Sequence, residues 1–141
     1  MKPNVGILVV THGDSGAAML VAVAALVGQT TLDDAAALAI APGEGRESIA
    51  RRLDEAVGRL DRGSGVLIAC DLLGSTPANC SVELKRSGRN LEVVFGVNLP
   101  MLVKLASMDR QVTLASLADL AVRTATRSIR AGDAGDGGAS T

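Results

Sequence analysis

The chain has 141 residues and a formal net charge of −1, from 14 basic and 15 acidic residues. This length suits one domain with its own core, and the balanced charge creates no overall field that would attract nucleic acid or an anionic membrane. The sequence has no tryptophan or tyrosine and one phenylalanine, so it lacks the aromatic platforms on which nucleic-acid bases stack, and the core must be aliphatic.

Strand and helix patterns alternate along the first half of the chain. Residues 5–11 (VGILVVT) are apolar and rich in β-branched side chains, which predicts a buried strand. Residues 16–27 (GAAMLVAVAALV) predict an alanine-rich helix that ends at Gly28. A second strand is expected at 35–41, and a helix at 48–59, where apolar and charged residues recur with helical period.

The second half continues this alternation. Residues 65–70 (GVLIAC) predict a strongly apolar strand, and residues 77–85 (PANCSVELK) can form a helix because proline is tolerated in a first turn. Residues 91–95 (LEVVF) predict a fourth strand, followed by a helix at 99–107. A last, amphipathic helix is expected at 114–129.

This pattern predicts an α/β fold, doubly wound, with a mostly parallel four-stranded sheet and helices on both faces. In such sheets the ligand site lies beyond the carboxyl ends of the strands. The candidate site segments are therefore those that follow the four strands, namely 12–16, 42–47, 71–77 and 96–100. We expect one domain at 1–131 and a disordered tail at 132–141, which is small and polar.

Membrane, redox and metal functions are not indicated. The longest apolar run, 17–27, is shorter than the roughly 18 residues that span a bilayer, and no basic segment precedes it, so a cytoplasmic protein is expected. Cys70 and Cys80 are far outside C-x-x-C spacing and the chain has one histidine, so we expect buried free cysteines and no metal or other cofactor.

The segment VVTHGDSG, residues 9–16, places the only histidine of the chain at the end of the first strand. GDSG resembles the nucleophile segment of serine proteases, but a catalytic triad takes its histidine from a separate element, and His12 stands three residues before Ser15. The segment also completes neither the dinucleotide motif GxGxxG nor a phosphate loop with its lysine. His12 itself is the candidate, with a purely structural histidine as the alternative.

Asp71 follows the third predicted strand, at the same edge of the sheet as His12. A carboxylate beside an imidazole fixes its tautomer and leaves the other ring nitrogen as a nucleophile. Gly13, Ser75 and Thr76 could then donate hydrogen bonds to a phosphoryl group on that nitrogen, aided by the dipoles of the following helices. The alternative for Asp71 is an ordinary turn or capping residue.

Three segments together resemble the signatures of a known family. GILVVTHGDSGAAML, GVLIACDLLGSTPAN and GVNLPMLVKL look like those of the mannose-class enzyme IIA domains of the bacterial phosphoenolpyruvate-dependent sugar phosphotransferase system, in the family's order. Thr76 falls at the hydroxyl position of the family's glycine-serine-proline turn, and Asn79 matches its asparagine. Ser75 replaces a usual glycine and Ala78 a usual large aromatic, changes expected to alter the surface that docks the acceptor.

The resemblance implies a phosphocarrier. His12 would accept a phosphoryl group from the phosphohistidine of the carrier protein HPr and pass it to an enzyme IIB domain, with Asp71 as the orienting carboxylate. The resemblance also implies a fold of four parallel strands and one antiparallel edge strand, which two subunits of a homodimer exchange. Residues 127–131 are the candidate edge strand.

HPr is expected to dock on an apolar rim around His12. The candidate contacts are Leu72, Leu73, Leu99, Pro100 and Met101. Buried packing is the alternative for the two adjacent leucines. The alternative function is a stand-alone regulatory domain, phosphorylated by HPr, that signals to a non-transport partner, and a third possibility is an α/β domain without phosphoryl chemistry. The sugar cannot be inferred, because such a domain handles only the phosphoryl group.

Overall fold

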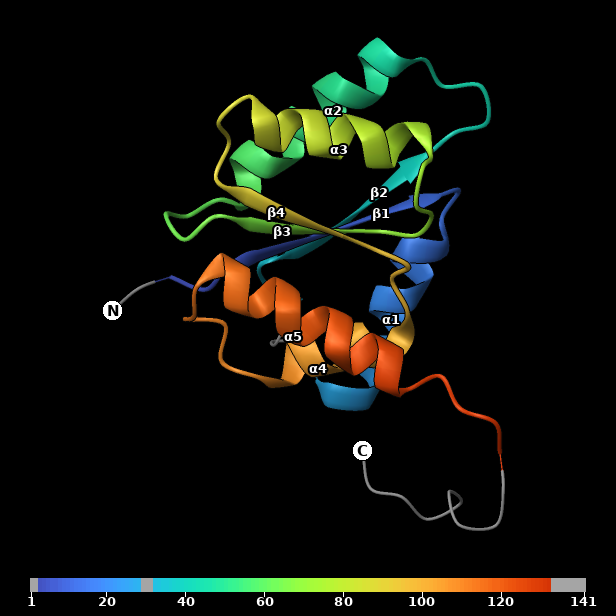
Figure 1. Ribbon diagram of the computed structural model, residues 1–141, viewed down its shortest axis with the longest axis vertical. Helices are drawn as coiled ribbons and strands as arrows, with labels where there is room; N and C mark the ends of the chain where they lie inside the picture. The colour runs from blue at the N-terminus through green and yellow to red at the C-terminus, as the bar shows by residue number, and fades with distance from the viewer. Residues whose placement is uncertain (1–2, 29–31, 133–141) are drawn as a thin grey trace.

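A computed structural model describes residues 3–28 and 32–132, which form one four-stranded sheet with helices on both faces (Figure 1). The strands are β1 (Gly6–His12), β2 (Ala35–Ile40), β3 (Val66–Cys70) and β4 (Leu91–Phe95). They are all parallel, in the order β2-β1-β3-β4. The helices are α1 (Ser15–Val27), α2 (Arg46–Leu60), α3 (Thr76–Arg86), α4 (Leu99–Ser107) and α5 (Leu114–Arg127). The predicted doubly wound α/β fold is confirmed.

The local sequence explains where helix α1 ends. Gly28 closes α1 as predicted: its φ of 101° suits glycine, and its N–H donates to the Ala24 carbonyl at 2.9 Å. Helix α2 begins at Arg46, two residues before the predicted start, because the pattern of apolar side chains does not reveal the first turn. Within the described ranges, no helix combines the length and apolar character needed to cross a membrane.

The two faces of the sheet pack against two separate cores. Side chains alternate along β1, so that Ile7 and Val9 pack with α1, α4 and α5, whereas Leu8 and Val10 pack with α2 and α3. Figure 1 shows these two groups of helices on opposite faces of the sheet. Because both faces are covered, the central strands β1 and β3 are nearly continuous apolar runs.

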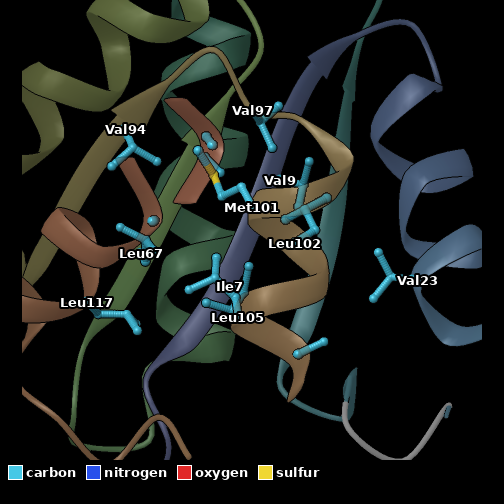
Figure 2. Close-up of a cluster of buried hydrophobic side chains, with 14 of the residues drawn as sticks. Ile7, Val9, Val23, Leu67, Val94, Val97, Met101, Leu102, Leu105 and Leu117 are labelled. Carbon is cyan, nitrogen blue, oxygen red and sulfur yellow. The ribbon is translucent and has the colours of Figure 1, made fainter. Parts of the chain in front are cut away.

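Met101 lies in the first of these cores, among Leu102, Leu105 and side chains of β1 and β3 (Figure 2). It is fully buried, because the spacing of Met101, Leu102 and Leu105 puts all three on the face of α4 that packs on the sheet. The prediction that Met101 contacts a docking partner is therefore wrong for this chain. Pro100 is exposed and Leu99 is partly buried.

The predicted edge strand at 127–131 is not a strand here. Arg127 is the last residue of α5, the Ser128 N–H donates to the Ala125 carbonyl at 3.3 Å, and residues 129–132 have no regular structure. In the described part of the chain, β4 pairs only with β3. Exchange of this segment in a homodimer stays a prediction. Apart from Gly132, the predicted tail lies outside the described residues.

Candidate functional site

His12 and Asp71 meet at the carboxyl edge of the sheet. His12 is the last residue of β1, and Asp71 directly follows the neighbouring strand β3. The two carboxylate oxygens lie 3.2 and 3.1 Å from His12 Nδ1. The backbone N–H of His12 also donates to Asp71 Oδ2 at 2.9 Å. The carboxylate therefore holds both the ring and the backbone of His12.

This contact determines which ring nitrogen of His12 keeps a free lone pair. An ionised carboxylate only accepts hydrogen bonds, so the Nδ1 that faces Asp71 carries the proton and Nε2 keeps its lone pair. The His12 side chain is 50% exposed and that of Asp71 24%. The ring is thus open to a partner molecule, while the carboxylate that orients it is largely covered.

A tight turn follows β1. Gly13 has a φ of 64°, in the left-handed region that favours glycine, and its N–H donates to the Ile40 carbonyl at 2.9 Å. Thr11 Oγ1 accepts the Gly16 N–H at 2.8 Å and donates to the Gly13 carbonyl at 3.3 Å. A Cβ on Gly16 would lie 3.0 Å from Thr11 Oγ1 and 3.1 Å from Val9 Cγ1, so a larger residue would require these side chains to shift.

The loop between β3 and α3 contains the other predicted contacts. Leu72 and Leu73 are 58% and 72% exposed, which rules out buried packing for them. Ser75 caps α3: its Oγ accepts the Ala78 N–H at 3.4 Å and donates to the Leu72 carbonyl at 2.7 Å. Ala78 is buried, so the replacement of the expected aromatic at this position lies in the core and not on the surface.

The three residues predicted to donate hydrogen bonds to a phosphoryl group differ in whether their donor is already bonded within the chain. The Gly13 amide is bonded to the Ile40 carbonyl, and the Ser75 hydroxyl donates to the Leu72 carbonyl. Thr76 is exposed at the first position of α3. Thr76 therefore presents the more accessible of the two hydroxyls, and the contacts themselves stay predictions.

The segment after β4 lies one strand further from His12, because β3 stands between β1 and β4. Asn98 caps α4, with Oδ1 accepting the Met101 N–H at 3.0 Å, and its Nδ2 donates to the Ala125 carbonyl at 3.2 Å. This side chain ties the start of α4 to the end of α5. Leu99 and Pro100 belong to the same edge of the sheet as His12, but they are not its nearest neighbours in strand order.

Both cysteines are buried and free, as predicted. Burial raises the pKa of the Cys70 thiol to about 11, and the negative charge of the adjacent Asp71 acts in the same direction. Burial also raises the pKa of Cys80. Both shifts favour the neutral thiol over the nucleophilic thiolate. Among the described residues, no three His, Cys, Asp or Glu side chains are grouped as metal ligands.

Glu44 organises the turn after β2. Its carboxylate accepts the Ser48 hydroxyl at 2.7 Å, Arg52 Nη1 at 2.7 and 2.9 Å, and the Ala41 N–H at 3.2 Å. The hydrogen bond from Ser48, followed by that from Arg52, lowers the pKa of Glu44 from 4.5 to about 2. A carboxyl whose pKa falls on folding stabilises the fold above its unfolded pKa and loses that contribution as pH falls through its folded pKa.

Replacing Glu44 with Gln is therefore expected to lower the thermal unfolding midpoint by a few degrees near neutral pH. The difference from the unmodified chain should shrink as pH falls from 4.5 toward 2, where the native carboxyl also becomes neutral. Thermal unfolding monitored by circular dichroism across this range measures the effect. Glu55→Gln, on the exposed face of α2, serves as the control, and a pH-independent difference for Glu44→Gln would contradict the prediction.

Known proteins resemble this chain in sequence and fold. The family model described as "PTS system fructose IIA component", where PTS stands for phosphotransferase system, matches residues 6–122. The "PTS system mannose-specific EIIAB component" of Escherichia coli (strain K12) is 29% identical over 129 residues, which are 91% of this chain and 39% of that protein. The chain thus spans about two fifths of the length of this relative.

Solved structures agree with the family model. The PTS IIA protein associated with the fucose utilization operon of Streptococcus pneumoniae is 30% identical, with a TM-score of 0.78 over 91% of this chain and 93% of that one. The mannose/sorbose specific IIA subunit of Enterococcus faecalis has a TM-score of 0.81 at 23% identity, over 93% and 96%. Because the matched region contains the whole sheet, His12 and Asp71, the chain belongs to the PTS IIA component family of this model.

Proposed function

We propose that the chain is a phosphohistidine carrier. His12 accepts a phosphoryl group from the phosphohistidine of HPr and passes it to an enzyme IIB component in sugar uptake. The observation that carries this proposal is the contact of the Asp71 carboxylate with His12 Nδ1 at 3.1 Å and with the His12 N–H at 2.9 Å. Membership of the PTS IIA component family supports a role in phosphoryl transfer for sugar uptake.

The transfer exchanges one P–N bond for another. The bond between phosphorus and the donor imidazole breaks, the donor nitrogen keeps the electron pair, and the lone pair of His12 Nε2 forms the new bond. The His12 ring gains positive charge in this step, which the Asp71 carboxylate offsets through the Nδ1–H. Because the broken and formed bonds are similar, the rate depends mainly on alignment and charge compensation.

The surroundings of His12 suit a group that is negatively charged. Helix α1 begins at Ser15, three residues after His12, and its N-terminus carries the positive end of the helix dipole. Thr76, the first residue of α3, is exposed and follows Asp71 in the loop after β3. In the proposed carrier these groups stabilise the phosphoryl oxygens once the group is on Nε2.

Incubation with phosphoenolpyruvate, enzyme I and HPr tests the proposal. We expect the chain to gain the mass of one phosphoryl group, and we expect enzyme IIB to remove it when added afterwards. An unchanged mass would overturn phosphocarrier activity. Phosphorylation without transfer to any enzyme IIB would instead support the regulatory alternative.

The exposed leucines after Asp71 are proposed as the docking surface for HPr. Leu72→Asp places a charge in this apolar surface and should slow transfer from HPr by at least about tenfold, with the unfolding midpoint unchanged. Leu26→Asp is the matched control, because Leu26 is 65% exposed near the C-terminal end of α1, away from His12. Rapid-quench measurement of transfer gives the rates, and equal rates for the two variants would place the docking surface elsewhere.

A further inference from the structure

We propose that Thr11 is a positioning residue for His12, whose buried hydroxyl fixes the turn after β1 and thereby sets the imidazole against Asp71. The inference rests on the proposed function, in which His12 Nε2 receives the phosphoryl group. Thr11 is 1% exposed, so it acts on the reaction through the backbone and not by contact with a partner.

The direction of the Thr11 side chain supports this indirect role. Successive side chains of a strand point to opposite faces, so Thr11 shares the face of Val9, and both side chains lie beside Gly16 of α1. Figure 2 shows Val9 in the core on this side of the sheet. His12 belongs to the opposite face, where the neighbouring strand brings Asp71 to it. Thr11 and the reacting ring are thus on different sides of the same strand end.

The Thr11 hydroxyl makes two hydrogen bonds within the turn, one as acceptor and one as donor. Its oxygen accepts the buried Gly16 N–H at 2.8 Å, and its proton is donated to the Gly13 carbonyl at 3.3 Å. These two bonds enclose the backbone from Thr11 to Gly16, which includes His12. Without the hydroxyl, a buried N–H at the start of α1 loses its acceptor, and the turn must move to find another.

Of the two remaining anchors of His12, one lies in this turn and the other comes from the neighbouring strand end. The His12 N–H donates to Asp71 Oδ2 at 2.9 Å, and the His12 carbonyl accepts the Ser15 hydroxyl at 3.3 Å. A shift of residues 13–16 therefore displaces the carbonyl group of His12, whereas the bond to Asp71 keeps its N–H in place. Misplacement of the ring by about 1 Å is enough to slow an aligned transfer by orders of magnitude.

Three variants test the proposal. Thr11→Val keeps the shape and removes the hydroxyl, Thr11→Ser keeps the hydroxyl, and Thr113→Val is the matched control. Thr113 Oγ1 accepts the Ser116 N–H at 3.2 Å and caps α5, at the edge of the sheet opposite to His12. Thr11→Val should slow transfer from phosphorylated HPr by about tenfold or more, whereas Thr11→Ser and Thr113→Val should transfer within about threefold of the unmodified rate.

The imidazole signals give a readout that a purely structural role would not change. Because His12 is the only histidine, nitrogen-15 spectra of its ring are unambiguous. The unmodified chain, Thr11→Ser and Thr113→Val should show mainly the Nδ1–H tautomer, and Thr11→Val should shift toward the tautomer mixture of free imidazole. A folded Thr11→Val variant with the unmodified rate, or with a reduced rate but unmodified ring signals, would overturn the proposal.

The two proposals fail in distinguishable ways. If HPr does not phosphorylate the unmodified chain, the proposed function fails, whereas the ring spectra, which need no donor, still test the positioning by Thr11. If Thr11→Val does not fold, Thr11→Ala removes the hydroxyl without a second methyl group beside Gly16. The expected and contradicting results for Thr11→Ala are the same as for Thr11→Val.

Discussion

Replacing His12 with Gln is expected to reduce phosphorylation of the chain by HPr to below detection. The sequence contains no other imidazole that could take the group. Glutamine keeps a side-chain N–H that can donate to Asp71, so the fold should be preserved while the nucleophile is lost. Intact-mass measurement after incubation with phosphoenolpyruvate, enzyme I and HPr gives the result, with circular dichroism to establish that the variant is folded.

The stability of the bound phosphoryl group in acid and alkali shows whether His12 or a nearby hydroxyl of the unmodified chain is the acceptor. A phosphoryl group on Nε2 is a phosphoramidate, which is labile in acid and stable in alkali. A phosphoryl group on Ser15 or Ser75 would be stable in acid. An acid-stable label, or any label that survives in His12→Gln, would reject His12 as the acceptor.

Replacing Asp71 with Asn should have a different effect. The amide keeps the size of the side chain, but it removes the negative charge that selects the Nδ1–H tautomer and offsets the charge on the phosphorylated ring. We expect the transfer rate to fall by roughly two to four orders of magnitude, as for other carboxylates that fix a histidine tautomer. Rapid-quench measurement of transfer from phosphorylated HPr gives the rate.

Asp109→Asn is the matched control for Asp71→Asn. Asp109 Oδ1 also accepts a backbone N–H, from Gln111 at 3.0 Å, in the segment between α4 and α5. Both variants therefore lose a charged acceptor from a loop, and Asp71→Asn also loses the carboxylate beside the imidazole. A transfer rate in Asp71→Asn equal to that of the unmodified chain would indicate that Asp71 is an ordinary turn residue.

The sheet was predictable because its strands are buried on both faces. Residues 66–70 and most of β1 are apolar without interruption, and such runs separated by helical patterns leave few arrangements other than a parallel sheet. Parallel topology then brings the ends of neighbouring strands together, which is why the contact between His12 and Asp71 follows from sequence. The edge segment 127–131 was not predictable, because helical period continues to Arg127 and strand pairing depends on a neighbour.

The details of the site depend on tertiary contacts that sequence patterns do not contain. Met101 follows a strand end like Leu72, but the spacing of Met101 and Leu105 directs both into the core, a helical signal that could have excluded Met101 from the surface. Thr11 was not among the predicted site residues. Its signal was a single hydroxyl at the end of an apolar strand, and only the folded turn shows that Gly16 is its partner.

The hydrogen bond from the His12 backbone N–H to Asp71 restricts how partner proteins can reach the imidazole. The imidazole is attached to the end of a central strand and does not swing between two places as a group on a flexible arm would. In the proposed carrier, donor and acceptor must therefore visit the same exposed ring one after the other, and each excludes the other while bound. The expected steady-state kinetics are of the double-displacement type, and an excess of unphosphorylated HPr competes with the acceptor for the occupied site.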